Sequence, residues 1–227
     1  MLAGLALSIG FIALMLDGSE LFTENFLVPV SAVIARQATL RRLVRLWAGA
    51  FVSNLVGGWV LMWVVMSGFP SLRSTAIATG TRYVALGLRW RAFALALLGG
   101  LVITLMTWMQ HATRSIGART VAAVIAAFLL GAGTLNHTIV TSVAMFGALH
   151  AGRAPFGYLS WLESALWAGL GNVVAGVGLV TVLRLLQVPD RLRRGRPRAE
   201  APVRRDHPGA AGLWRRRAGG GWLASAG

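Results

Sequence analysis

Long apolar runs separated by short charged loops dominate the chain. Residues 46–66, 92–110 and 164–183 contain no charged side chain, and each run has the length needed to cross about 30 Å of hydrocarbon as a helix. We therefore predict three ordinary membrane-spanning helices. The composition agrees, because 56% hydrophobic and only 13% charged residues make a chain of 227 residues far too apolar for a soluble domain.

Two further apolar segments are interrupted by polar residues. Residues 120–149 are uncharged and would measure roughly 45 Å as one helix, but GAGTLNH in their middle combines two glycines with Thr134, Asn136 and His137. At the start of the chain, GSELFTEN separates an uncharged run of 16 residues from a second apolar run that ends before Arg36. In each segment we expect two half-helices joined by a loop at membrane depth.

The two interrupted segments resemble one another in the order of their motifs. LFT at 21–23 is followed by SNLVGG with Asn54, and LNH at 135–137 is followed by GNVVAG with Asn172. Two complete spans lie between the interrupted segments, so the copies are offset by three crossings and run in opposite directions. The pattern predicts an inverted repeat of three helices, with two discontinuous helices meeting at the midplane. Since such a repeat has six spans and five segments are present, we expect the first span to be missing through a truncation or a misplaced start codon.

Arginine placement predicts the orientation. Loops 36–45 and 114–119 and the tail that begins at 184 fall on one side of the predicted membrane, and the other side carries four arginines within 73–91 and Arg153. The positive-inside rule places the first side in the cytoplasm. We expect residues 1–188 to form the membrane domain and the basic, Gly- and Pro-rich residues 189–227 to form a disordered cytoplasmic tail.

Charge and cysteine content narrow the possible functions. The net charge of +15 comes largely from the tail and the arginine-rich loops, so attraction to anionic lipid headgroups explains it more simply than nucleic-acid binding. Cysteine is absent from the sequence, which excludes disulfides and thiolate metal sites. We expect no nucleic-acid partner, no cofactor and no metal site.

The four motifs resemble those of the formate/nitrite transporters, a family of pentameric channels and carriers for small monovalent anions. The matching elements are GSELFTEN, SNLVGG, LNHTIV and GNVVAG, in this order. The resemblance covers residues 1 to about 188 and implies an all-α, aquaporin-like fold with six helices and one pore per protomer, here without the first helix. It further implies a multi-pass inner-membrane protein, a homopentamer, a substrate such as formate or nitrite, and no enzymatic activity.

The resemblance also implies roles for individual residues. Thr23 matches a hydroxyl offered to the substrate, His137 matches the central pore histidine, and Asn54 and Asn172 match polar residues of the substrate pathway that support the loops. The residues that match the family's apolar constrictions are Leu7, Phe11, Leu21, Phe22 and Leu130. Two positions depart from the family pattern, because Leu130 replaces a common large aromatic residue and Glu24 replaces a small or amide residue.

His137 has two interpretations. As a structural residue, it is a buried imidazole bonded to a neighbouring hydroxyl or amide such as Thr134, Asn136 or Asn172. As a functional residue, it opens one half-helix while Thr23 opens the inverted one, so both positive helix ends point at a small anion in the pore centre. A weak acid that takes a proton near His137 would cross the apolar rings in neutral form and avoid the cost of desolvating a carboxylate.

The acidic residues around the first break require a separate explanation. Asp17, Glu20 and Glu24 are three of the seven acidic residues of the chain. A carboxylate at a half-helix N-terminus accepts backbone N–H bonds, so we expect a structural role for Glu20. Because a carboxylate lining an anion path would repel the substrate, we expect Glu24 to point away from the pore or to be protonated.

Three alternative interpretations remain open from the sequence. A passive channel for water, small alcohols or undissociated acids on the same fold would use His137 only as a hydrogen-bonding group. A haem or metal enzyme would need a second intramembrane ligand beside His137, and the sequence offers neither a histidine in another span nor a cysteine. Finally, a chain without its first span could fail to assemble.

Overall fold

The computed structural model describes residues 2–18 and 21–194, and it gives side-chain surroundings for residues 4–18 and 21–179. Contacts divide the chain into Met1–Val188 and Pro189–Gly227. Glu20 and residues 195–227 lie outside the described residues, so the role of Glu20 and the disorder of the tail stay predictions. The described elements are α1 (Leu2–Asp17), η1 (Phe22–Phe26), α2 (Val28–Ile34), α3 (Leu40–Gly68), η2 (Pro70–Leu72), α4 (Arg73–Leu86), α5 (Trp90–His111), α6 (Ile116–Ala132), α7 (Thr138–His150) and α8 (Tyr158–Arg194).

Three helices are long and apolar enough to cross a membrane. These are α3, α5 and the Tyr158–Leu179 part of α8, and they coincide with the uncharged runs 46–66, 92–110 and 164–183. Hydroxyl side chains cap the N-termini of α3 and α6. Thr39 accepts the backbone N–H of Arg42 at the start of α3, and Ser115 accepts that of Ala118 at the start of α6. The prediction of an all-α membrane fold is confirmed.

The two remaining apolar segments are broken where polar residues interrupt them. The α1 helix and the η1–α2 segment are together long and apolar enough to form one membrane span, but they are bent by 58° at the break. The second segment consists of the shorter apolar helices α6 and α7, which are separated by residues 133–137. Both interruptions therefore occur within the motifs that predicted them.

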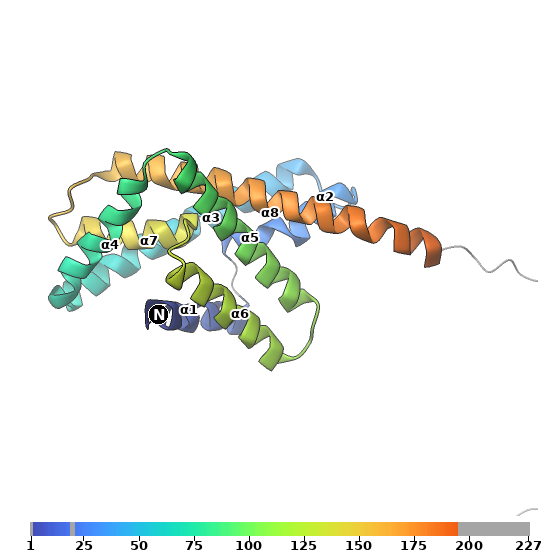
Figure 1. Cartoon of the computed structure of the whole chain (residues 1–227), viewed down its shortest axis with the longest axis horizontal. Coiled ribbons are helices and arrows are strands. Elements are labelled where there is room, and N and C mark those ends of the chain that lie inside the picture. The colour runs from blue at the N-terminus through green and yellow to red at the C-terminus, as the bar shows by residue number, and fades with distance from the viewer. Residues whose placement is uncertain (1, 19–20, 195–227) are drawn as a thin grey trace, which may run out of the picture. The chain divides into compact units, whose positions relative to one another are not determined.

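The broken segments pack against one another and against the long spans. In Figure 1, α1 lies beside α6, and α7 lies beside α3 and α4. The α5 helix packs against both α6 and η1. This arrangement brings the two helix breaks together although they are more than 100 residues apart in the sequence.

The loop between the first two long spans is a helix that the hydrophobic pattern did not predict. Residues 73–86 form α4, whose sequence RSTAIATGTRYVAL mixes polar and apolar positions. The helix docks through Gly80, since a Cβ added there would lie 2.6 Å from the Cβ of Ala148 in α7. This close approach to α7 stabilises a segment whose composition alone resembles a loop.

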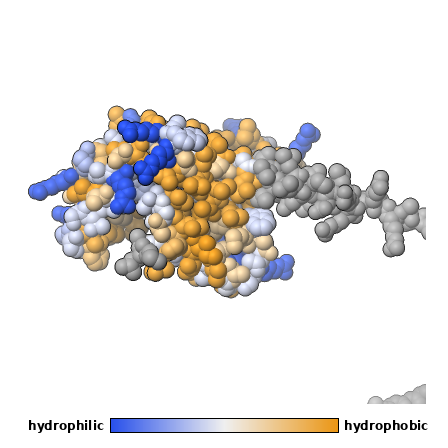
Figure 2. Space-filling view, in the orientation of Figure 1, coloured by the Kyte–Doolittle hydropathy of each residue, from blue (hydrophilic) through white to orange (hydrophobic). Residues whose placement is uncertain are grey.

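The surface of the helices is largely apolar. Most side chains of α3 are exposed, including Trp63 and Val64, whereas α5 is more deeply buried. Figure 2 shows hydrophobic residues across the middle of the molecule and hydrophilic residues on both sides of this band. An exposed apolar face of this extent is stable in contact with lipid or with another apolar protein surface, but not with water.

Candidate functional site

The first helix break presents Thr23. The α1 helix ends at Asp17, and Gly18 follows with a φ of +73°, a conformation that glycine adopts without strain. Leu21 is the N-cap of η1, and a Glu24 carboxylate oxygen accepts its backbone N–H at 3.3 Å. This bond closes the turn around Thr23, whose side chain is fully buried.

The second break presents His137. Thr134 follows α6 with a φ of +47°, which is uncommon for a residue with a side chain and marks the reversal of the backbone. His137 is the N-cap of α7, and its Nδ1 accepts the backbone N–H of Val140 at 3.3 Å. The imidazole therefore fills the place that a serine or asparagine side chain commonly takes at a helix start.

The two breaks meet in a single hydrogen bond. Thr23 Oγ1 lies 2.7 Å from His137 Nε2, and both side chains have 0% of their surface exposed. Because Nδ1 accepts a backbone N–H, a neutral imidazole carries its proton on Nε2 and donates it to Thr23 Oγ1. The Thr23 hydroxyl then keeps its own proton to donate to a third group. The partner of His137 is thus the inverted segment, and not Thr134, Asn136 or Asn172.

Two asparagines hold the breaks in place in the same way. Asn54 in α3 accepts the backbone N–H of Phe22 through Oδ1 at 2.8 Å, and Asn172 in α8 accepts that of Thr138 at 2.9 Å. Each asparagine thus satisfies a backbone donor next to Thr23 or His137. The arrangement gives the two asparagines a positioning contact, and it repeats across the two halves of the chain.

Asn172 makes further bonds that Asn54 does not share in the described structure. Its side-chain amide donates to the carbonyls of Ala96 at 2.7 Å and Asn136 at 3.1 Å. Asn136 in turn accepts the Thr141 hydroxyl at 3.1 Å and donates to the carbonyl of Ala92 at 3.3 Å. Motif matching did not assign these roles to Asn136, although its position beside the histidine in LNH was a signal.

The apolar residues that were predicted to form constrictions gather in one place. Phe11, Leu21, Phe22 and Leu130 belong to one buried hydrophobic cluster, and Leu7 packs against it. The structure thus brings all five predicted constriction residues together. The ring of Phe22 lies edge-on to aromatic rings of η1 and α3, with centroids 5.1 Å from Phe26, 6.0 Å from Trp47 and 5.2 Å from Phe51.

Glycines allow the helices to approach the site. A Cβ added at Gly100 in α5 would lie 2.6 Å from the Cα of Asn172, and one added at Gly171 in α8 would lie 2.6 Å from the Cβ of Ala96. Both distances are shorter than real carbon atoms tolerate. The close contact of α5 with α8 is what lets the Asn172 amide reach the Ala96 carbonyl.

Glu24 does not line the Thr23–His137 contact. Its carboxylate closes the turn at Leu21 and lines a cavity that also involves Thr107, His111 and Arg119. Sequence reasoning missed this cavity, because its residues come from the first helix break and from the α5–α6 connection, which lie far apart in the chain.

Comparison with known proteins identifies relatives of the chain. The sequence profile described as formate/nitrite transporter matches residues 1–186. The inner membrane protein YfdC of Escherichia coli is 25% identical over 209 residues, which cover 88% of this chain and 65% of that protein. The formate channel FocA of Haemophilus influenzae is 26% identical over 122 residues, which cover 51% of this chain and 42% of that protein.

A solved structure shares the fold. The pentameric formate channel with formate bound superposes with a TM-score of 0.66 at 23% identity, over 82% of each chain. The chain spans less than two thirds of the length of the two curated relatives. Since the family profile covers 186 of 227 residues, the chain belongs to the formate/nitrite transporter family.

Proposed function

We propose that the protein is a membrane channel or transporter for small monovalent weak-acid anions of the formate or nitrite type. The observation that carries this proposal is the buried Thr23–His137 contact of 2.7 Å at the meeting of two helix breaks. The relatives named formate channel support an anion of this size. Because the formate-bound channel that shares the fold is pentameric, a homopentamer is the assembly that we propose for this chain as well.

The geometry suggests how a proton could reach the substrate. In the neutral state, Nε2–H of His137 points to Thr23 Oγ1 while Nδ1 is bonded to the Val140 N–H. A second proton on Nδ1 would break the Val140 bond and produce an imidazolium. The Thr23 hydroxyl could then give its proton to a bound carboxylate and take the Nε2 proton, leaving a neutral acid and a neutral imidazole.

Protonation of the substrate would lower the free-energy cost of moving it through the apolar cluster. A carboxylate among Phe11, Leu21 and Leu130, which are all buried, would lose most of its hydration without gaining hydrogen-bond donors. The undissociated acid would lose much less. Anions of strong acids, which cannot take this proton, would therefore be excluded by their charge.

We also propose the orientation that the arginines predict. Residues 36–45, Arg114 in the α5–α6 loop and Arg119 in the first turn of α6 would face the cytoplasm together with the C-terminal tail. The inner-membrane location follows the name of the Escherichia coli relative. Cysteine accessibility labelling of A38C and S115C in intact cells tests this, because only membrane-permeant reagents should reach cytoplasmic positions.

The decisive experiment compares uptake of labelled formate into proteoliposomes at pH 5 to 8, with and without a proton gradient. His137→Asn is the informative variant, since an asparagine still caps α7 but cannot exchange a proton. His150→Ala, a histidine at the far end of α7, is the matched control. Gradient-driven uptake that disappears in H137N and persists in H150A supports proton transfer at His137.

A passive neutral-solute channel on the same fold is the alternative. The Thr23–His137 pair would then serve only as a hydrogen-bonding station. Uptake by the wild type that ignores the gradient, with H137N unchanged, would favour this alternative and refute the protonation mechanism. A wild type that passes neither formate nor acetate but passes glycerol would refute anion transport altogether.

A further inference from the structure

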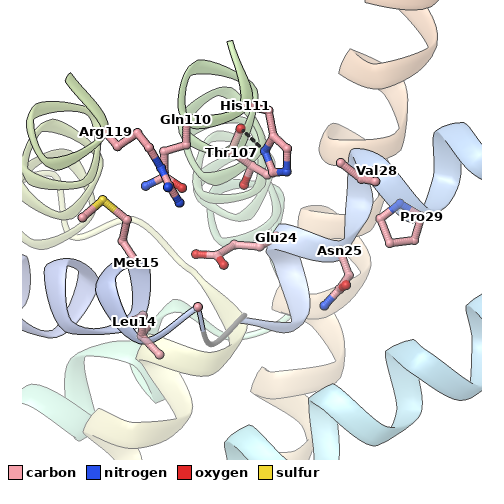
Figure 3. Close-up of a pocket in the computed structure, with 11 residues that line it drawn as sticks. Leu14, Met15, Glu24, Asn25, Val28, Pro29, Thr107, Gln110, His111 and Arg119 are labelled. Carbon is pink, nitrogen blue, oxygen red and sulfur yellow. Dashed lines mark hydrogen bonds between the residues drawn. The ribbon is translucent and has the colours of Figure 1, made fainter. Parts of the chain in front are cut away.

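A polar cavity adjoins the segment that carries Thr23. It has a volume of about 210 Å³ and is formed where α1 ends, η1 and α2 begin, α5 ends and α6 begins (Figure 3). We call it the Glu24 cavity; its polar lining residues are Glu24, Asn25, Thr107, Gln110, His111 and Arg119. The Thr23–His137 contact does not belong to it, because those two side chains do not line the cavity.

Arg119 is the main group in the cavity with unused bonding capacity. Its Nε is buried and has no hydrogen-bond partner among the described residues, although an unpaired buried donor is costly. The guanidinium comes from the first turn of α6, which begins at Ile116, where the helix dipole also favours a negative charge. A planar anion such as a carboxylate would supply the missing acceptor.

The other side chains of the cavity have part of their bonding fixed. His111 Nδ1 lies 2.8 Å from the Thr107 carbonyl and must donate to it, since a carbonyl only accepts. The Asn25 amide donates to the Leu21 carbonyl at 3.3 Å. Gln110 lines the cavity together with Arg119 (Figure 3). Its side-chain amide adds a second donor group to the lining.

Among the described lining residues, Glu24 contributes the one carboxylate. In Figure 3 its carboxylate and the Arg119 guanidinium point into the same space from opposite sides. One carboxylate oxygen also accepts the Leu21 N–H, so Glu24 is tied to the apolar residue that precedes Thr23 by two positions. A charge in this cavity is therefore coupled to the segment that carries both Leu21 and Thr23.

We propose that the Glu24 cavity is an antechamber that binds one small monovalent anion between Arg119 and Gln110 before it reaches the Thr23–His137 pair. Glu24 competes with that anion for the guanidinium. The competition keeps binding weak, because a conducting site must release its ion as readily as it takes it up. This inference rests on the proposed function for the identity of the anion.

The competition also gives Glu24 a role that fits its departure from the family pattern. An unopposed arginine would hold a carboxylate through two charge-assisted hydrogen bonds and slow its release. The Glu24 carboxylate makes the lining one charge unit more negative than it would be without it. Only an anion compact enough to reach the guanidinium directly then displaces this carboxylate. The carboxylate thus selects for small anions rather than blocking the path.

The test measures formate flux into oriented membrane vesicles as a function of formate concentration, with substrate supplied on either face. Arg119→Gln should raise the half-saturating concentration about tenfold or more when formate is supplied on the cavity side, with little change on the other side. Arg119→Lys keeps the charge but not the planar guanidinium, so its half-saturating concentration should lie between those of the wild type and R119Q. Arg114→Gln, in the loop just before α6, is the matched control and should behave as the wild type.

Glu24→Gln tests the competition separately, because glutamine still offers an oxygen to the Leu21 N–H. We expect the half-saturating concentration on the cavity side to fall about two- to fivefold and the maximal flux to fall with it, as release slows. If R119Q matches R114Q in flux from both faces, or if E24Q raises the half-saturating concentration, the antechamber is refuted. Thermal unfolding of each variant identifies any that is misfolded, and R119K then replaces R119Q.

A transport-independent measurement separates this inference from the proposed function. Line broadening of [13C]formate by purified protein reports binding whether or not formate crosses. Broadening that R119Q abolishes in a protein with no formate flux would retain the antechamber and refute formate transport. Flux without any effect of R119Q on flux or broadening would retain the proposed function and refute the antechamber.

Discussion

Replacing Asn172 should destabilise the protein more than replacing its counterpart Asn54, although the two asparagines occupy corresponding motifs. In Asn172→Ala, the backbone N–H of Thr138 loses its acceptor at 2.9 Å. This N–H belongs to the first turn of α7 and has no partner within the helix. Leaving such a buried donor unpaired costs about 1–3 kcal/mol.

The two bonds donated by the Asn172 amide each add a smaller amount. The Ala96 carbonyl lies inside α5 and keeps its helical hydrogen bond, so each lost amide bond costs about 0.5–1.5 kcal/mol. The total for Asn172→Ala is then about 2–6 kcal/mol. Asn54→Ala removes the single bond to the Phe22 N–H at a half-buried position, and about 1 kcal/mol is expected.

Unfolding of purified protein in mixed micelles, followed by the fluorescence of the nine tryptophans, measures both values. Asn172→Asp is the discriminating variant, because its side chain can still accept the Thr138 N–H but, when ionised, has no donor for the carbonyls of Ala96 and Asn136. We expect N172D to be at least as unstable as N172A at pH 8. Equal stability of N172A and N54A, or a neutral effect of N172D, would refute the assignment of Asn172 as the stronger anchor.

Three further substitutions test the packing and the central contact. Thr23→Val removes the acceptor of the His137 N–H while keeping the shape, so formate flux should fall about tenfold or more, whereas Thr23→Ser should retain most of it in the same uptake assay. Gly100→Ala forces a methyl group against the backbone of Asn172 and should cost about 1–3 kcal/mol of unfolding free energy; Gly49→Ala, with open space around it, should be neutral or stabilising. Phe26→Ala removes a fully buried ring and should cost about 3–5 kcal/mol in the same unfolding measurement.

The spans and the breaks could be predicted from the sequence because they depend on local composition. An uncharged run of about 20 residues must cross the bilayer or be buried, and GSELFTEN and GAGTLNH contain too many polar groups and glycines to continue a helix in lipid. The α4 helix was missed for the opposite reason. Its polar and apolar residues show no strong periodicity, and its docking depends on the space beside Gly80 and Ala148.

The site was predicted only in part, because its contacts join distant residues. The motifs selected Thr23 and His137 individually, but their bond links positions 114 residues apart and depends on how α1 packs against α6. The tautomer of His137 follows only from its bond to Val140. Likewise, the Glu24 cavity requires the first helix break to converge with the ends of α5 and α6, which no local pattern specifies.

The repeat is symmetric in its supports and asymmetric in its chemistry. Asn54 and Asn172 each bind a backbone N–H beside a helix break, yet one break presents a hydroxyl and the other an imidazole. Two hydroxyls could pass a proton along but could not store one, and two imidazoles would place two potential positive charges 2.7 Å apart in an apolar cluster. A hydroxyl facing an imidazole supplies one proton store and one proton carrier. The two asparagines therefore hold the helix breaks in the same way and fix the distance between Thr23 and His137. The two unlike residues give their hydrogen bond a direction, from the imidazole N–H to the hydroxyl oxygen.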